Sequence, residues 1–198
     1  LKYKNNDTIL KQETYPMPDG TELVLLKYPL LEQTGIVGHC FSTRYGGVSE
    51  GFLGSMNLSF SRGDKKENVE ENFRRITSVL GKGIEDLVFT DQTHTTNVRK
   101  VTAADAGCGI VKERKYTDID GLITDEPGLV LATFYADCVP LYFVDPVHRA
   151  IGLSHSGWRG TAGRMGAVTL AAMERAYGTK PQDVICAIGP SICQECYE

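Results

Sequence analysis

Cysteine and histidine side chains follow two strand-like runs in the second half of the chain. Cys138 comes shortly after the apolar run at residues 129–135. His155 comes directly after a second apolar run at residues 149–154. Side chains of these types at neighbouring strand ends can form a nucleophile–base pair or two corners of a metal site. The residues therefore predict a reactive site and leave the choice between these two chemistries open.

His94 adds a third side chain of a metal-binding type. It lies between the strand-like runs at residues 87–90 and 95–101, so we expect it within or at the edge of a strand. Three nitrogen or sulfur ligands from separate strand ends match the catalytic zinc pattern of three protein ligands and one open position. Taken alone, each of the three residues is more often a packed core side chain, and their wide spacing in the sequence does not decide the matter.

Two arginines beside glycine-rich turns are candidates for binding phosphate or ribose. Arg44 precedes Gly46 and Gly47, and Arg159 precedes Gly160. The planar guanidinium group matches the geometry of a phosphate, whereas a surface or structural salt bridge is the alternative role for each arginine. The glycines after His155 let the backbone approach a ligand and lead into a predicted helix whose free N–H groups could hold an anion.

Three further polar residues lie next to these candidates. Gln92 precedes His94 by two residues, so in a strand the two side chains would share a face, and Gln92 could hydrogen-bond a substrate. Asp120 and Asp137 could act as general acid–base groups or could orient a metal ligand. The commoner role of an aspartate at a strand end is structural.

Composition excludes several classes of protein. The formal net charge of −4 argues against a nucleic-acid partner, which would normally select a basic surface. No apolar run approaches the ~18 residues that span a bilayer, so we expect no membrane partner. Six cysteines without an export signal indicate reduced thiols in a cytoplasmic protein. The expected partner is therefore a small-molecule substrate.

The pattern of elements predicts an α+β fold of mixed β-sheets flanked by helices. One helix is expected to begin after Asp64, which would cap it together with Glu67, and to end before Gly81. A second helix is expected over residues 164–177, and residues 102–118 are interpreted as a mobile surface loop. The predicted strands are residues 21–28, 36–43, 87–90, 95–101, 120–124, 129–135, 149–154 and 183–188.

Six motifs, taken in order, resemble those of the YfiH/YlmD-like family, also called laccase-domain or multicopper polyphenol oxidase proteins. They are FSTRYGGVSEG, DQTHTTNV, DGLIT, ADCVPLYFVDP, SHSGWRGT and IGPSICQECYE. The resemblance implies a layered α/β/β/α sandwich and a zinc ion on His94, Cys138 and His155. It also implies phosphorolysis of adenosine, inosine, guanosine and methylthioadenosine, together with deamination of adenosine. Trp158 could then stack against a purine.

Other functions associated with this family stay open as alternatives. In one, Cys138 is the nucleophile and His155 the base of a metal-free hydrolase that edits peptidoglycan precursors. In another, the protein is a copper polyphenol oxidase, but four histidines are too few for several copper ions, and a single copper in the zinc site is the remaining option. A third is a non-catalytic zinc module whose fourth ligand comes from Cys193 or Cys196.

The resemblance also bears on domain organisation. We interpret residues 1–198 as a single domain of this family. Because family members continue beyond the Cys-Tyr-Glu run that ends this sequence, we expect the C-terminal part of the family domain to be missing.

Overall fold

The computed structural model describes residues 9–197 as two compact units. The first unit combines residues 9–33 with residues 38–84, and the second combines residues 34–37 with residues 85–197. The interpretation of the whole chain as a single domain stays a prediction. No helix among the described residues is long and apolar enough to cross a membrane.

The first unit is built on a three-stranded antiparallel sheet in the order β1-β2-β3. Its strands are β1 (Lys11–Pro16), β2 (Glu22–Lys27) and β3 (Phe41–Ser42), and its helices are α1 (Pro29–Glu32), η1 (Gly51–Leu53) and α2 (Lys66–Val79). Leu23 and Leu25, on one face of β2, are fully buried with Met56, and Ile76 and Val79 of α2 pack against them. Because alternate residues of a strand share a face, Leu23 and Leu25 together give the unit its core.

The predicted cap of α2 is wrong. The helix begins after Lys65 and has no side-chain hydrogen bond at its cap. The carboxylate of Asp64 instead accepts hydrogen bonds from Ser49 at 2.6 Å, Asn57 at 3.0 Å and Asn68 at 3.0 Å. Ser49 and Asn57 of the preceding loop bond one carboxylate oxygen, and Asn68 of α2 and the Lys65 N–H bond the other, so Asp64 has no free acceptor for the usual capping contact.

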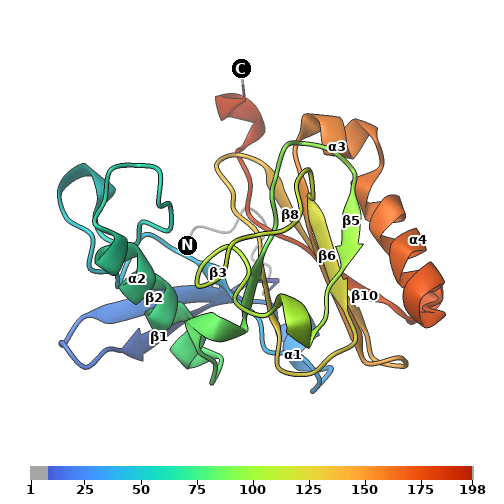
Figure 1. The fold of residues 1–198 in the computed structure, drawn as a ribbon, viewed down its shortest axis with the longest axis horizontal. Coiled ribbons are helices and arrows are strands. Elements are labelled where there is room, and N and C mark those ends of the chain that lie inside the picture. Colours follow the sequence, from blue (N-terminus) through green and yellow to red (C-terminus); the bar gives the residue numbers. More distant parts are fainter. Residues whose placement is uncertain (1–8, 198) are drawn as a thin grey trace. The chain divides into compact units, whose positions relative to one another are not determined.

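The second unit contains a five-stranded sheet in the order β10-β8-β9-β6-β5 and a two-stranded parallel pair, β4 and β7. The central strands β8 and β9 form an antiparallel hairpin, and α4 lies along the sheet (Figure 1). The strands are β4 (Leu87–Phe89), β5 (Val98–Lys100), β6 (Gly121–Thr124), β7 (Val130–Ala132), β8 (Val139–Asp145), β9 (Ala150–Ser156) and β10 (Ile185–Ile188). The helices are η2 (Ile84–Asp86), η3 (Ala103–Asp105), α3 (Trp158–Ala162), α4 (Met165–Tyr177), η4 (Pro181–Asp183) and η5 (Gln194–Cys196).

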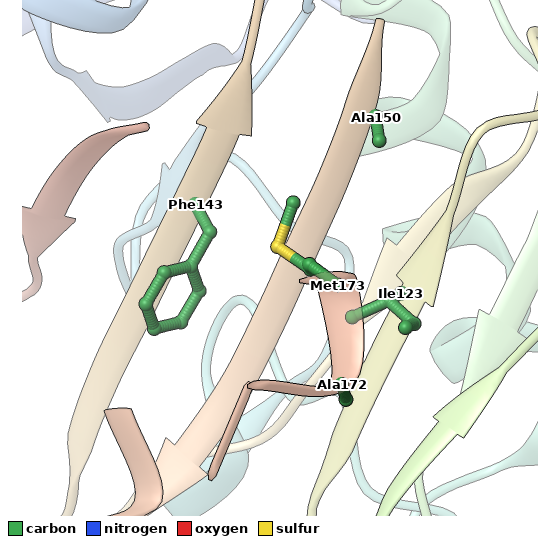
Figure 2. Close-up of a cluster of buried hydrophobic side chains, with 5 residues drawn as sticks. All are labelled: Ile123, Phe143, Ala150, Ala172 and Met173. Atoms are coloured by element: carbon green, nitrogen blue, oxygen red, sulfur yellow. The ribbon is translucent and has the colours of Figure 1, made fainter. Parts of the chain in front are cut away.

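The core of the sheet lies beneath α4. Met173 of α4 is fully buried between Phe143 of β8 and Ile123 of β6, and Ala150 and Ala172 complete the cluster (Figure 2). Gly152 lets the helix approach β9, since a Cβ at this position would lie 3.3 Å from the Met173 sulfur. Burial of this apolar face fixes the β8–β9 hairpin, and the hairpin in turn carries two of the candidate site residues.

The expected α+β fold of mixed sheets and flanking helices is confirmed, but the strand assignments needed correction. The strand β8 was not predicted, because Pro140 removes a backbone donor and is uncommon inside a strand. The run at residues 129–135 forms only the short strand β7. Residues 102–118 are not simply a surface loop, because they contain η3 and the buried side chain of Cys108, which packs against Val88 and Leu122.

We predict that Met173→Ala destabilises the second unit by about 2–5 kcal/mol, because it removes buried methylene groups and leaves a cavity under α4. Urea denaturation followed by circular dichroism measures the change. Glu174→Ala is the matched control, because Glu174 is exposed on the same helix, and its substitution should change the stability by less than about 0.5 kcal/mol. Equal destabilisation by the two variants would contradict this account of the core.

Candidate metal centre

The hairpin register brings two of the three candidate ligands together. Pro140 of β8 pairs with His155 of β9, and Val139 pairs with Ser156. Cys138 immediately precedes β8, so it lies beside His155 although seventeen positions separate the two residues in the sequence. Antiparallel pairing, rather than sequence spacing, therefore creates this part of the site.

His94 reaches the same place from the loop between β4 and β5. One ligand atom from each of His94, Cys138 and His155 lies within 4.8 Å of the other two. The His94 and His155 rings meet edge to face with their centroids 5.0 Å apart, and Cys138 Sγ lies 3.9 Å from His94 Nε2. The three residues thus form a His-Cys-His cluster that could hold a metal ion.

The His94 backbone is held in an unusual conformation. Its φ angle is +66°, in the left-handed region that non-glycine residues rarely adopt. The backbone N–H groups of Thr93, His94 and Thr95 all donate to the carboxylate of Asp120, at 3.1, 3.1 and 2.9 Å. Three successive N–H groups around one carboxylate stabilise this turn, which presents the His94 ring to the cluster.

Asp120 also fixes the second histidine. Its Oδ1 lies 2.8 Å from His155 Nδ1, and both side chains are buried. An ionised carboxylate only accepts hydrogen bonds, so Nδ1 of His155 carries the proton and Nε2 is left with a lone pair for a ligand. This is the carboxylate–histidine arrangement that orients histidines at metal sites.

The ionised state of Asp120 is favoured by its surroundings. Burial alone would raise the pKa of this carboxyl, but hydrogen bonds from His155, Thr95 and Thr93 together hold the pKa below its usual value. The Thr95 hydroxyl adds a further donor at 2.9 Å. Asp120 therefore carries a negative charge at neutral pH although none of its surface is exposed.

The surroundings of Cys138 do not activate its thiol. Burial, followed by repulsion from the carboxylates of Asp137 and Asp120, raises the pKa of Cys138. A cysteine nucleophile normally has a lowered pKa, which a neighbouring cation or helix N-terminus provides. A bound metal cation would stabilise the thiolate directly, so this environment fits a metal ligand better than a free nucleophile.

The separation between the Cys138 and His94 ligand atoms fits a small metal ion. Bond lengths of about 2.3 Å to sulfur and 2.0–2.1 Å to nitrogen, at a tetrahedral angle, separate the two ligand atoms by about 3.6 Å. The observed separation of 3.9 Å between Cys138 Sγ and His94 Nε2 is close to this value. Gly157 makes the approach of the two side chains feasible, because a Cβ here would lie 2.9 Å from His94 Cδ2 and 3.0 Å from Cys138 Sγ.

The other predicted site residues have different surroundings. Gln92 and His94 do not lie in a common strand. The Gln92 side-chain amide donates to the Phe134 carbonyl at 2.6 Å and accepts from the Phe134 N–H at 2.7 Å. Its oxygen also accepts from the Thr90 hydroxyl. Arg159 is exposed on α3 with its guanidinium carbon 5.2 Å from the centre of the Trp158 ring. Their roles as substrate contacts stay predictions.

Arg44 belongs to the first unit, where its guanidinium donates to the Gly54 carbonyl at 2.8 Å. Its predicted contact with phosphate likewise stays a prediction. Tyr135 was not among the predicted site residues. Its ring centroid lies 5.7 Å from that of His155, and its hydroxyl donates to the Ser154 carbonyl at 3.2 Å. From the sequence alone, an aromatic residue at the end of an apolar run cannot be recognised as a neighbour of the site, because a core residue gives the same pattern.

A sequence model of the family described as multi-copper polyphenol oxidoreductase laccase matches residues 38–198. The chain belongs to this family. It is 39% identical over 157 residues to a protein named purine nucleoside phosphorylase YlmD from Geobacillus stearothermophilus, an alignment that covers 79% of this chain and 57% of the relative. It is 38% identical over 161 residues to the protein of the same name from Bacillus subtilis, with the same coverage.

Two crystal structures share the fold. YlmD from Geobacillus stearothermophilus superposes with a TM-score of 0.81 at 34% identity, over 96% of this chain and 67% of that one. YfiH from Bacillus licheniformis superposes with a TM-score of 0.79 at 36% identity, over 88% of this chain and 64% of that one. The family resemblance and the mixed α/β fold are thereby confirmed. The chain spans less than two thirds of the length of the two YlmD relatives.

We predict that Asp120→Asn weakens metal binding by about 10–100-fold. An amide has one acceptor oxygen in place of two, so it cannot accept all the N–H groups that bond the carboxylate, and it does not fix the tautomer of His155. Competition with a chromogenic chelator measures the affinity for zinc, and copper is measured in parallel. Asp118→Asn is the control, because the exposed Asp118 carboxylate also accepts from Thr93, through its hydroxyl at 2.9 Å, and is not a member of the His-Cys-His cluster. Unchanged affinity in Asp120→Asn would show that this carboxylate does not orient the cluster.

We also predict that Gly157→Ala lowers metal affinity while the protein stays folded. The new methyl group would press on both His94 and Cys138 and separate their ligand atoms. Gly166→Ala, in α4, is the matched control, because its Cβ would meet only the Leu141 side chain, at an ordinary distance of 3.8 Å. The same chelator competition compares the two variants, and the account of the site is wrong if they bind metal equally well.

Proposed function

We propose that this protein is a zinc-dependent purine nucleoside phosphorylase that also deaminates adenosine. The observation that carries the proposal is the convergence of His94, Cys138 and His155 on one point, with His155 oriented by a buried carboxylate. The names of the YlmD relatives support the choice of reaction. The chain covers only part of those relatives, so their names alone do not carry the activity, and the proposal depends on this cluster.

The donor set supports zinc. One thiolate and two imidazoles are typical zinc ligands, and among the described residues the cluster has three members, which leaves a coordination position for a reactant. A single copper ion is the alternative occupant, since imidazole and thiolate also suit copper. When bound, zinc would supply Lewis acidity toward the reacting oxygen or nitrogen groups.

Phosphorolysis requires an anion site next to the cluster. A phosphate oxygen attacks C1′ of the ribose, the bond from C1′ to the purine nitrogen breaks, and its electron pair leaves with the purine. Arg159 follows Gly157 by two residues, and its exposed guanidinium forms no ion pair with any described residue. We assign phosphate binding to Arg159.

The departing purine needs a proton. Asp120 cannot provide it, because its carboxylate is fully buried and occupied by hydrogen bonds from the His94 loop and His155. Asp137 is exposed beside Cys138 and has a φ angle of +83°, an unusual conformation that often marks functional residues. We therefore propose that Asp137 relays a proton from solvent water to the departing purine, and we assign stacking of the purine to the exposed Trp158 ring.

Deamination of adenosine uses the same cluster differently. Water adds at C6 of the purine and ammonia leaves, so no phosphate is consumed. The open position of the cluster is suited to activating that water. The two reactions therefore differ in their need for phosphate and in their products.

Two alternative functions have less support. A Cys138 hydrolase that edits peptidoglycan precursors would need a free thiolate, which burial and the neighbouring carboxylates disfavour. A polyphenol oxidase with several coppers would need more histidine ligands than the four in this chain.

We predict phosphate-dependent release of hypoxanthine from inosine, with an equal amount of ribose 1-phosphate. Liquid chromatography measures both products. Cys138→Ala and His155→Ala should each lower the rate by more than about 100-fold, because each removes a metal ligand. Cys186→Ala should keep full activity, since Cys186 lies on β10 outside the cluster.

Arg159→Ala separates phosphate binding from metal binding. It should raise the KM for phosphate by about 10-fold or more and leave the zinc content unchanged. Deamination of adenosine should persist in phosphate-free buffer and in this variant. A zinc-loaded protein that releases no purine base with phosphate, but cleaves a peptidoglycan precursor or oxidises a phenol, would overturn the proposed function.

A further inference from the structure

The C-terminal segment carries two cysteines that the metal centre does not use. Cys193 and Cys196 flank Gln194 and Glu195 in a short turn, η5, and both residues are exposed. The N–H of Cys196 donates to the carbonyl of Cys193 at 3.1 Å, which closes the turn. Neither cysteine belongs to the His-Cys-His cluster.

The turn brings the two thiols together. Residues three apart in a 3₁₀ turn lie on the same side of it, with Cα atoms less than about 7 Å apart. A hydrogen bond between the two thiols raises the pKa of Cys196. A disulfide needs Cα atoms roughly 4.4–6.8 Å apart, so this turn already has the separation that a disulfide requires.

The cysteine pair is connected to the metal centre through the backbone. The N–H of Ile192 donates to the carbonyl of Asp137 at 3.0 Å, and the N–H of Gly189 donates to the carbonyl of Pro140 at 2.8 Å. These two bonds attach the C-terminal segment on either side of Cys138. In Figure 1 this segment, in dark red, runs past the end of β8.

The other described cysteines are less suited to thiol chemistry. Cys108 is buried in the core, burial raises the pKa of the Cys40 thiol, and Cys138 belongs to the cluster. Cys186 is exposed on β10, but burial is the cause that raises its pKa, and no thiol hydrogen bond from another described cysteine contributes. Exposure and a neighbouring thiol favour exchange with a disulfide, because the attacking sulfur must be accessible and a resolving sulfur must lie within reach.

We propose that Cys193 and Cys196 form a reversible intrachain disulfide, a thiol–disulfide switch beside the metal centre. The oxidant is a low-molecular-weight disulfide such as oxidised glutathione. One cysteine thiolate attacks a glutathione sulfur and releases one glutathione thiol. The second cysteine thiolate then attacks the mixed disulfide and releases the other glutathione thiol. The chain loses two electrons and two protons, and the oxidised glutathione gains them to become two molecules of reduced glutathione.

Oxidation should reach the metal centre through Ile192. Formation of the disulfide removes the freedom of the turn that follows Ile192 and so changes the hydrogen bond from Ile192 to Asp137, the residue before Cys138. We expect the zinc dissociation rate to differ by at least about 3-fold between the two redox states. This readout needs no catalytic activity, so it can succeed or fail independently of the phosphorylase assay.

The experiment equilibrates the zinc-loaded protein with mixtures of reduced and oxidised glutathione. Free thiols are then blocked, and the chain is cleaved on the carboxyl side of Glu195, between the two cysteines. The two fragments stay joined only while the Cys193–Cys196 disulfide is intact. Mass spectrometry should detect the joined fragments, lighter by two hydrogen atoms, in oxidising mixtures and the separate fragments after reduction.

Cys193→Ser and Cys196→Ser should each abolish the joined fragments and accumulate a stable glutathione adduct on the remaining cysteine. Cys186→Ser, on the neighbouring strand, should leave the switch intact. A disulfide that joins Cys138 to either cysteine would overturn the proposal. So would the absence of any joined fragment in the most oxidising mixture, or zinc dissociation that is the same in both redox states.

Discussion

The candidate site depends on one buried carboxylate. Asp120 has no exposed surface, and a charge in such a place is tolerated only when hydrogen bonds satisfy it. The N–H groups of the loop at residues 93–95 and the imidazole of His155 provide these bonds. The same carboxylate therefore shapes the turn that presents one histidine and fixes the protonation of the other. Loss of either set of donors would leave an unpaired buried charge, so the two histidines are energetically coupled.

The rest of the second unit provides the frame for this interaction. Asp120 directly precedes β6, which pairs with β9, so the carboxylate and the His155 ring are brought together by strand pairing. Packing of α4 on the sheet holds β9 against β8, and β8 begins directly after Cys138. The position of Cys138 thus depends on a hydrophobic contact well away from it. Gly157 completes the arrangement by omitting the one side-chain atom that would separate the ligands.

The sequence selected the three residues of the cluster but did not predict the geometry that holds them. Residue types and the family resemblance selected His94, Cys138 and His155, and the long amphipathic helices and the mixed fold also followed from the pattern of residues. The strand β8 was not predicted, because proline disfavours a strand locally. Pairing with β9 overrides this local preference at Pro140. For Asp120 the sequence offered two roles, acid–base chemistry or the orientation of a metal ligand, and could not choose between them. Its contacts depend on backbone N–H groups of a turn at positive φ, which side-chain spacing does not reveal.

The histidines also explain why the family description does not settle the metal. His39 is buried in the first unit, where its Nε2 accepts a hydrogen bond from the Tyr28 N–H at 2.7 Å. His148 lies at the turn between β8 and β9, with its Nδ1 2.8 Å from the buried carboxylate of Asp145. Both therefore have structural partners of their own. Only His94 and His155 remain for a metal, and two imidazoles with one thiolate can complete one mononuclear centre but not a cluster of copper ions.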